Sequence, residues 1–156
     1  MNEQRGTHHY QDDPRNADVL IYVHGELVPR ARAMVSVFDS GFILGDGVWE
    51  GLRLHNGHFA FLDEHLKRLW QGAKAIDLDL GMSRDELAGE LQRTVEANGM
   101  ESGVHVRLMV TRGMKATPYQ DPRVNIGGPT IVIIPEHKQA AEREDGMRLS
   151  GLFVFG

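Results

Sequence analysis

Short apolar runs separated by turn residues characterise the first part of the chain. Residues 19–23 (VLIYV) are apolar, residues 24–26 (HGE) interrupt them, and residues 27–29 (LVP) resume the run. Apolar runs bounded in this way are typical of strands, so we predict a hairpin here. Residues 33–38 (AMVSVF) predict a further short strand, which the Asp-Ser-Gly sequence at 39–41 ends.

A second hairpin is predicted around Asn56 and Gly57. These two residues separate extended runs over 48–55 and 58–62. An Asn-Gly pair favours a two-residue type I′ turn, because both central residues of that turn have positive φ angles. This is the strongest hairpin pattern in the sequence.

Two helices are predicted after the hairpins. Apolar residues recur at steps of three and four, which predicts an amphipathic helix over about residues 63–76. Ser83 and Glu86 have the spacing of a capping box, so we predict that a second helix opens at Ser83. Gly99 is the expected stop for this helix.

Strand patterns return in the last third of the chain. Residues 104–111 alternate between apolar and polar side chains, which predicts a half-buried strand. Residues 114–129 are rich in Pro, Gly and Asn and predict a long loop, and the apolar run 130–134 (TIVII) predicts a buried strand. This order of elements predicts an α+β fold: a small two-layer domain with two helices on one face of an antiparallel or mixed sheet.

The polar segments divide the chain into four parts. Residues 1–16 lack apolar periodicity and predict a mobile N-terminal tail. The small α+β domain is expected over 17–135, and the polar residues 136–146 are expected to form a linker between domains. Residues 147–156 (MRLSGLFVFG) predict a strand that would leave an open, apolar edge if it stood alone. We therefore expect it to be the first strand of a truncated C-terminal domain.

Composition narrows the possible classes of function. The chain has 156 residues, no cysteine and a net charge of −5. The lack of a basic cluster argues against nucleic-acid binding, and the lack of cysteine excludes thiolate metal sites and a cysteine nucleophile. No apolar run approaches the roughly 20 residues of a membrane span and no signal peptide is visible, so we expect no membrane association and a cytoplasmic location. His8 and His9 have no third ligand nearby, so no metal site is predicted.

A few charged residues are candidates for chemistry by their position alone. His105 and Arg107 share the polar side of an alternating strand, where Arg107 is either solvated or poised for a carboxylate or phosphate. Arg68 falls opposite the apolar stripe of its helix, which predicts a surface residue. Asp46 and Glu50 lie four residues apart among glycines that argue against a helix, so we expect a solvated structural role for them.

Five short motifs, taken in order, resemble the class IV pyridoxal-phosphate aminotransferases. They are residues 38–41 (FDSG), 45–51 (GDGVWEG), 56–57 (NG), 64–69 (EHLKRL) and 110–113 (VTRG). Each motif is weak alone, but their order and spacing make the set fairly specific. The family includes branched-chain and D-amino-acid aminotransferases. The resemblance implies that this chain corresponds to the family's small N-terminal domain and the first strand of its large domain.

The resemblance implies a cofactor and a residue that binds it. Arg68, the arginine of the EHLKRL motif, is similar to the family's ligand for the phosphate of pyridoxal 5'-phosphate. A guanidinium suits this role because its fork bonds two phosphate oxygens at once. Trp49 stands where the family usually has Tyr or Phe lining the substrate pocket, and its bulk favours medium-sized substrates.

Three further residues are implied to contact the substrate. Arg107 resembles an arginine that branched-chain enzymes keep near the substrate, and His105 replaces a tyrosine often found two residues earlier. D-amino-acid enzymes hold the substrate carboxylate with an Arg-x-His pair in the next loop, where this chain offers Thr117 and Tyr119. The resemblance therefore gives His105, Arg107 and Tyr119 substrate-binding roles and speaks against D-amino-acid specificity.

The catalytic lysine of the family has no counterpart in this sequence. Family enzymes form a Schiff base with a lysine of the large domain, which we expect beyond Gly156. The lysines present lie on the first predicted helix, in the long loop or in the linker: Lys67, Lys74, Lys115 and Lys138. No catalytic residue is assigned within the sequence, and we expect the chain alone to be inactive.

The sequence leaves three functions open. The first is the N-terminal part of an aminotransferase that moves an amino group between an amino acid, branched-chain-like or otherwise medium-sized, and a 2-oxo acid, and that works as a homodimer. The second is a lyase of the same family, similar to aminodeoxychorismate lyase. The third is a non-catalytic, stand-alone interaction domain.

Overall fold

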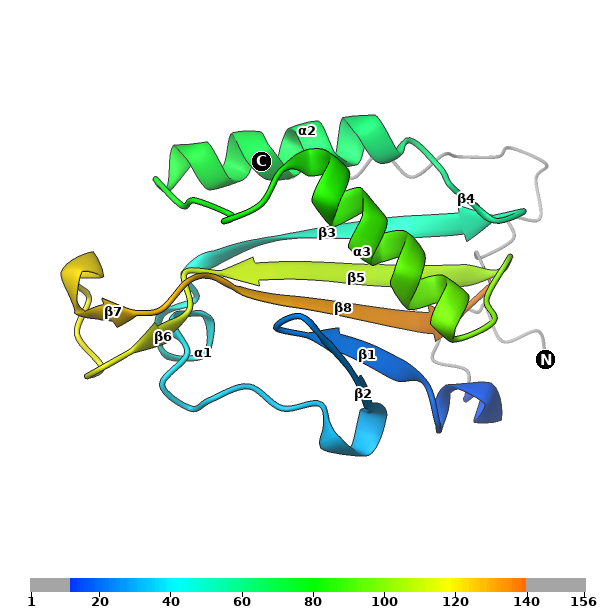
Figure 1. Ribbon diagram of the computed structural model, residues 1–156, viewed down its shortest axis with the longest axis horizontal. Helices are drawn as coiled ribbons and strands as arrows, with labels where there is room; N and C mark the ends of the chain where they lie inside the picture. Colours follow the sequence, from blue (N-terminus) through cyan, green and yellow to red (C-terminus); the bar gives the residue numbers. More distant parts are fainter. Residues whose placement is uncertain (1–11, 140–156) are drawn as a thin grey trace, which may run out of the picture.

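Six antiparallel strands form the sheet that organises the fold (Figure 1). The computed structural model describes residues 12–139. The strand order is β2-β1-β8-β5-β3-β4, and every neighbouring pair is antiparallel. The strands are β1 (Leu20–Val23), β2 (Glu26–Pro29), β3 (Gly47–His55), β4 (His58–Phe59), β5 (Val104–Thr111) and β8 (Thr130–His137), and a short 3₁₀ helix, η2 (Arg30–Arg32), follows β2.

Two helices cover one face of this sheet. Helix α2 (Leu62–Ala75) lies along β3, and α3 (Arg84–Ala97) crosses β1 and β8. The interface between the two layers is the hydrophobic core. Alternate residues of β5 face the helices and are fully buried: Val104, Val106, Leu108 and Val110. The predicted two-layer α+β fold is confirmed, because each layer buries an apolar face against the other.

Local sequence patterns account for several of the connections. Asn56 and Gly57 have φ angles of 50° and 76°, as the predicted type I′ turn requires. The Ser83 hydroxyl accepts a hydrogen bond from the Glu86 N–H, and the Glu86 carboxylate accepts one from the Ser83 N–H. Gly99 follows the end of α3 with a φ of 62°. The predicted hairpin, capping box and helix stop are therefore all confirmed.

The strand predicted over residues 33–38 is wrong. These residues are irregular, and the chain forms a short helix, α1 (Ser40–Leu44), directly after them. Asp39 caps α1 by accepting a hydrogen bond from the Gly41 N–H at 2.8 Å. Ala33 packs against the core, but the larger apolar residues of the segment, Met34, Val35, Val37 and Phe38, are exposed, and Met34 is 76% exposed. The apolar run therefore did not indicate a buried strand.

The long loop after β5 holds a small hairpin that the sequence did not predict. Strands β6 (Met114–Lys115) and β7 (Asn125–Ile126) pair with each other, and a 3₁₀ helix, η3 (Pro122–Val124), lies between them. The Lys115 N–H donates to the Phe38 carbonyl at 2.9 Å. This bond ties the hairpin to the segment that leads into α1.

The described end of the predicted N-terminal tail is ordered. Pro14–Asn16 form a 3₁₀ helix, η1, and the Asn16 side chain donates to the His137 carbonyl at 3.0 Å and accepts from its N–H at 2.7 Å. Asn16 thus replaces a strand partner for the last residue of β8, which runs two residues past the predicted domain end at 135. The rest of the predicted tail and linker, and the strand predicted over 147–156, lie outside the described residues.

Candidate functional site

Residues 47–52 of β3 form an edge of the sheet. Strand β5 pairs with β3 along almost its whole length, whereas β4 pairs only with the last two residues of β3. No strand within residues 12–139 therefore covers the other side of this segment. Helix α2 comes close to it, because a Cβ on Gly72 would lie 3.3 Å from the Cγ1 of Val48. Side chains from both faces of the sheet meet at this edge.

Glu50 on β3 is the centre of a charged cluster beneath α2. The residue is 2% exposed, and its carboxylate accepts hydrogen bonds from Arg68, by Nε at 2.6 Å and also by Nη2. The Nδ1 of His65 lies 2.8 Å from Glu50 Oε2. A carboxylate buried this deeply is stable only when it is paired and hydrogen-bonded. The solvated role predicted for Glu50 is therefore wrong.

Arg68 combines a fixed orientation with access to solvent. Its side chain is 53% exposed, as expected for a residue opposite the apolar stripe of α2. The hydrogen bond to Glu50 raises the pKa of Arg68 above its usual value, so the guanidinium is charged at any physiological pH. Its Nη1 has no hydrogen-bond partner among residues 12–139. The donor set on this outer edge fits a phosphate, because an arginine fork matches phosphate oxygens.

The opposite face of β3 brings together three of the predicted substrate residues. The guanidinium of Arg107 lies over the ring of Trp49, 4.1 Å from its centroid. Gly51 stands opposite Arg107 in the strand register, and a Cβ on Gly51 would lie 3.0 Å from His105 Nε2. The glycine thus leaves room for the imidazole. The result is a surface of one stacked cation and one histidine beside an indole that is half exposed.

His105 is neutral at physiological pH in this setting. Burial lowers its pKa to about 4, and the positive charges of Arg53, Arg107 and Lys138 contribute to the same shift. A neutral imidazole donates one hydrogen bond and accepts another. Together with the cationic Arg107, it offers complementary contacts to a carboxylate.

Tyr119 lies in the loop between β6 and β7 and is 68% exposed. Its backbone N–H donates to the Thr117 carbonyl at 2.7 Å. No ion pair or side-chain hydrogen bond of residues 12–139 joins its hydroxyl to His105 or Arg107. The structure thus brings Trp49, His105 and Arg107 together and leaves Tyr119 as a residue of an exposed loop.

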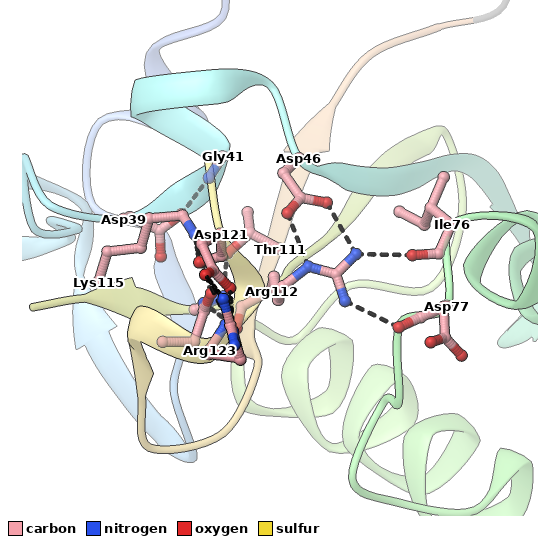
Figure 2. Close-up of polar contacts among 12 residues, drawn as sticks. Asp39, Gly41, Asp46, Ile76, Asp77, Thr111, Arg112, Lys115, Asp121 and Arg123 are labelled. Carbon is pink, nitrogen blue, oxygen red and sulfur yellow. Dashed lines mark hydrogen bonds and ion pairs between the residues drawn. The ribbon is translucent and has the colours of Figure 1, made fainter. Parts of the chain in front are cut away.

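Arg112 makes a dense set of bonds that sequence reasoning missed (Figure 2). Its Nε and Nη2 donate to the Asp46 carboxylate at 2.7 and 3.1 Å. Its Nη2 and Nη1 also donate to the carbonyls of Ile76 and Asp77, at 2.7 and 2.8 Å. The arginine therefore connects the end of β5 to the start of β3 and to the end of α2. The one feature of the sequence that pointed to Arg112 was the VTRG motif at residues 110–113.

Lys115 is the most buried of the four lysines in the sequence, at 2% exposed. Its Nζ donates to Asn125 Oδ1 at 2.9 Å and lies 3.4 Å from the carbonyl of Asp121. Both contacts lie within the small hairpin of β6 and β7. The ammonium group is thus engaged in holding this hairpin together.

Residues 12–139 hold neither a candidate metal cluster nor a candidate membrane span. That range has no cluster of three or more His, Cys, Asp or Glu residues able to hold a metal ion. It also has no helix with the length and apolarity to cross a membrane. His8 and His9 lie outside the described residues.

Comparison with known proteins assigns the family. Residues 47–150, more than half of the chain, match the model for amino-transferase class IV. The chain belongs to this family. The match includes the β3 edge, α2 and β5, and so contains Glu50, Arg68 and Arg107. The family resemblance of the sequence motifs is confirmed.

Curated class IV relatives differ in the substrates that their names give. Branched-chain-amino-acid aminotransferase-like protein 1 of Arabidopsis thaliana is 42% identical over 133 residues, which make up 85% of this chain and 24% of the relative. D-alanine aminotransferase of Listeria monocytogenes is 40% identical over 106 residues, 68% of this chain and 35% of the relative. This chain therefore spans about a quarter to a third of the length of these relatives.

Solved structures share the fold. The branched-chain aminotransferase of Thermoproteus uzoniensis, solved with norvaline, matches with a TM-score of 0.64 at 26% identity, over 76% of this chain and 40% of the other. The 4-amino-4-deoxychorismate lyase of Pseudomonas aeruginosa matches with a TM-score of 0.63 at 28% identity, over 79% of this chain and 42% of the other. Solved proteins named for two kinds of reaction thus contain a domain with this α+β fold.

A third solved structure holds a derivative of the cofactor. It is a branched-chain amino acid aminotransferase complexed with N-(5'-phosphopyridoxyl)-L-glutamate, and it matches with a TM-score of 0.65 at 28% identity. The match covers 74% of this chain and 40% of the other. Proteins that contain this α+β domain therefore include one that binds a phosphopyridoxyl group.

Proposed function

We propose that this chain is the part of a pyridoxal-phosphate-dependent aminotransferase that anchors the cofactor phosphate and lines the substrate pocket. The reaction moves an amino group between a medium-sized, branched-chain-like amino acid and a 2-oxo acid. The observation that best supports this proposal is the arrangement at the β3 edge. Glu50 orients Arg68 on one face of the sheet, and Arg107 lies over Trp49 on the other. Both faces are within reach of a ligand at this uncovered edge.

Each residue has a distinct task in this proposal. Arg68 would hold the cofactor phosphate by its outer edge, and the cofactor itself would supply the electron sink for reactions at the amino-bearing carbon. Arg107, held over the ring of Trp49, would bind a substrate carboxylate, and the neutral His105 would add a hydrogen bond. Trp49 would limit substrate size by its bulk.

We propose that none of the four lysines serves as the Schiff-base residue. Such a lysine must present a free amine and must be partly desolvated, because desolvation keeps the amine neutral. Lys115 has its amine bonded inside the small hairpin, and Lys67 and Lys74 are exposed on α2. Lys138 lies just past β8 and is also exposed. The lysine is therefore proposed to lie beyond Gly156, in keeping with the greater length of the relatives.

A same-family lyase is the second candidate. The lyase fold match favours it, because its identity to this chain equals that of the aminotransferase with the phosphopyridoxyl ligand. A panel of amino acids, 2-oxo acids and aminodeoxychorismate tested on the full-length gene product distinguishes the two reactions. The lyase reading is rejected if only the amino acids and 2-oxo acids react.

We further propose that the full-length protein is a homodimer. Exposed apolar residues before and within α1, such as Met34, Val37 and Phe42, support this proposal. Large exposed apolar side chains that lie this close together in the chain are common at interfaces between proteins. Sedimentation of the full-length gene product as a monomer at micromolar concentration would contradict the dimer.

Substitution of Arg68 tests the cofactor role. In the full-length gene product, Arg68→Ala should weaken binding of pyridoxal 5'-phosphate by about 10- to 150-fold, the loss expected when about 1.5–3 kcal/mol of charge-assisted bonding is removed. Titration followed by the visible absorbance of the cofactor measures this change. Lys67→Ala is the matched control, because it removes an exposed positive charge from the neighbouring position of α2. Equal affinities of the Arg68→Ala protein and the control would refute the role.

A further inference from the structure

Glu50 is more deeply buried, and bonded to more side chains, than an ordinary ion pair at the protein surface requires. Its side chain is 3% exposed, whereas that of its partner Arg68 is 53% exposed. Burying the carboxylate is costly, and an apolar residue of similar volume would often be as stable at such a position. The pairing of a buried acid with a solvent-facing base indicates a task on the solvent side.

The contact geometry identifies that task. Glu50 occupies the Nε and Nη2 side of the guanidinium, so the Nη1 edge faces away from it. A long arginine side chain at a half-exposed site loses much rotamer freedom when it is held in one orientation. Glu50 removes this freedom before any ligand arrives, which lowers the entropic cost of binding.

His65 supports the same arrangement from α2. It precedes Arg68 by three residues, so the two side chains lie on the same side of the helix. Its Nδ1 is 2.8 Å from Glu50 Oε2, the oxygen that also accepts from Arg68 Nη2. The imidazole therefore fixes the carboxylate that fixes the guanidinium.

We propose that Glu50, backed by His65, is a positioning residue that presets Arg68 for a phosphate group. This inference rests on the proposed cofactor role of Arg68. A positioning role and a purely electrostatic role of Glu50 predict opposite effects on phosphate binding. A negative charge beside a phosphate site repels the ligand, so a purely electrostatic Glu50 would weaken binding, whereas a positioning Glu50 strengthens it.

A double-mutant cycle with Glu50→Gln and Arg68→Ala in the full-length gene product tests the proposal. The probes are pyridoxal 5'-phosphate and pyridoxal, which lacks the phosphate, and the readout is the dissociation constant from absorbance titration. Glu50→Gln should weaken binding of the phosphorylated probe about 5- to 10-fold, because glutamine offers one acceptor oxygen in place of two. It should leave pyridoxal binding unchanged, and it should have no further effect in the Arg68→Ala background.

Two additional variants keep the test decisive. Glu64→Gln is the matched control, since Glu64 is an exposed acid on α2, the helix that carries Arg68, and the variant should bind both probes like the wild type. If circular dichroism shows that Glu50→Gln does not fold, His65→Gln takes its place. This variant should weaken binding of pyridoxal 5'-phosphate about two- to threefold, and only when Arg68 is present.

The outcomes separate the inference from the proposed function. Tighter or unchanged binding by Glu50→Gln, while Arg68→Ala binds weakly, overturns the positioning role and leaves the cofactor role intact. An equal loss with and without Arg68 also overturns it, because the effect is then a general structural one. Unchanged binding in Arg68→Ala itself overturns the proposed function.

Discussion

Arg68 and Arg112 both pair with an acid near the start of β3, yet they lead to different expectations. Arg112 donates hydrogen bonds to a carboxylate and two carbonyls, and its side chain is 18% exposed. Arg68 donates hydrogen bonds to one carboxylate only, and about half of its side-chain surface is exposed to solvent. Bidentate pairing with a carboxylate is common to both, so it does not by itself distinguish a structural arginine from a binding one.

The distinction lies in what remains of each guanidinium. Arginine has five N–H donors and no acceptor. In Arg112 all three nitrogens are engaged by protein atoms, so no further ligand is needed to satisfy the group. In Arg68 the Nη1 nitrogen has no hydrogen-bond partner among residues 12–139, so it is available to a ligand. A held but incompletely bonded arginine is therefore the better marker of an anion site.

The largest effect is expected from Arg112→Ala. Its loss leaves the Asp46 carboxylate and the carbonyls of Ile76 and Asp77 without their donor, which should lower the free energy of unfolding by about 2–4 kcal/mol. Urea denaturation measures this change. The folded fraction of the variant should bind pyridoxal 5'-phosphate almost as the wild type does. A large loss of cofactor affinity with little loss of stability would reverse the distinction drawn between the two arginines.

The sequence predicted those parts of the fold that depend on local periodicity. Alternation identified β5, and the Asn56-Gly57 pair identified the turn before β4, because both patterns act over a few neighbouring residues. The apolar run 33–38 also suggested a strand, but most of its large side chains are exposed, so its pattern was misleading. Burial depends on distant neighbours, which a local pattern does not report.

The site was less predictable for the same reason. Glu50 meets His65 and Arg68 across 15 and 18 residues, and Arg112 meets Asp46 across 66. Helical periodicity correctly placed Arg68 on the exposed side of α2, but only the fold shows that β3 supplies a buried acid to it. The motif resemblance supplied its expected role because family motifs already encode such distant contacts.

A smaller effect is expected from pH, at the arginine that has a ring rather than an acid as its partner. Arg107 lies over Trp49, and His105 beside it has its pKa lowered to about 4. The unfolded chain, with an ordinary histidine pKa near 6.5, binds the proton more readily, so stability is complete above about pH 6.5 and falls as the pH drops toward 4. Because His105 is only half buried, we expect this loss to be about 1–2 kcal/mol.

The variant His105→Gln isolates this contribution. It lacks the titrating group, so its unfolding free energy should fall less than that of the wild type between about pH 7 and pH 4.5. Both proteins share the same carboxylates, whose titration cancels in the difference. Parallel pH profiles for the two proteins would contradict a depressed pKa at His105, and with it the neutral partner assigned to Arg107.

The smallest effect is expected at Arg123, which repeats the bidentate geometry without burial. Its Nε and Nη2 donate to Asp121 at 2.9 and 2.6 Å, but the two residues are two positions apart and the arginine side chain is 89% exposed. Water replaces these bonds at little cost, and the pair joins no distant elements. Arg123→Ala should therefore change neither the thermal unfolding midpoint nor the affinity for pyridoxal 5'-phosphate. A clear shift in either quantity would mean that geometry alone gives an arginine–carboxylate pair its importance, and exposure and sequence separation would no longer explain why Arg68 and Arg112 differ.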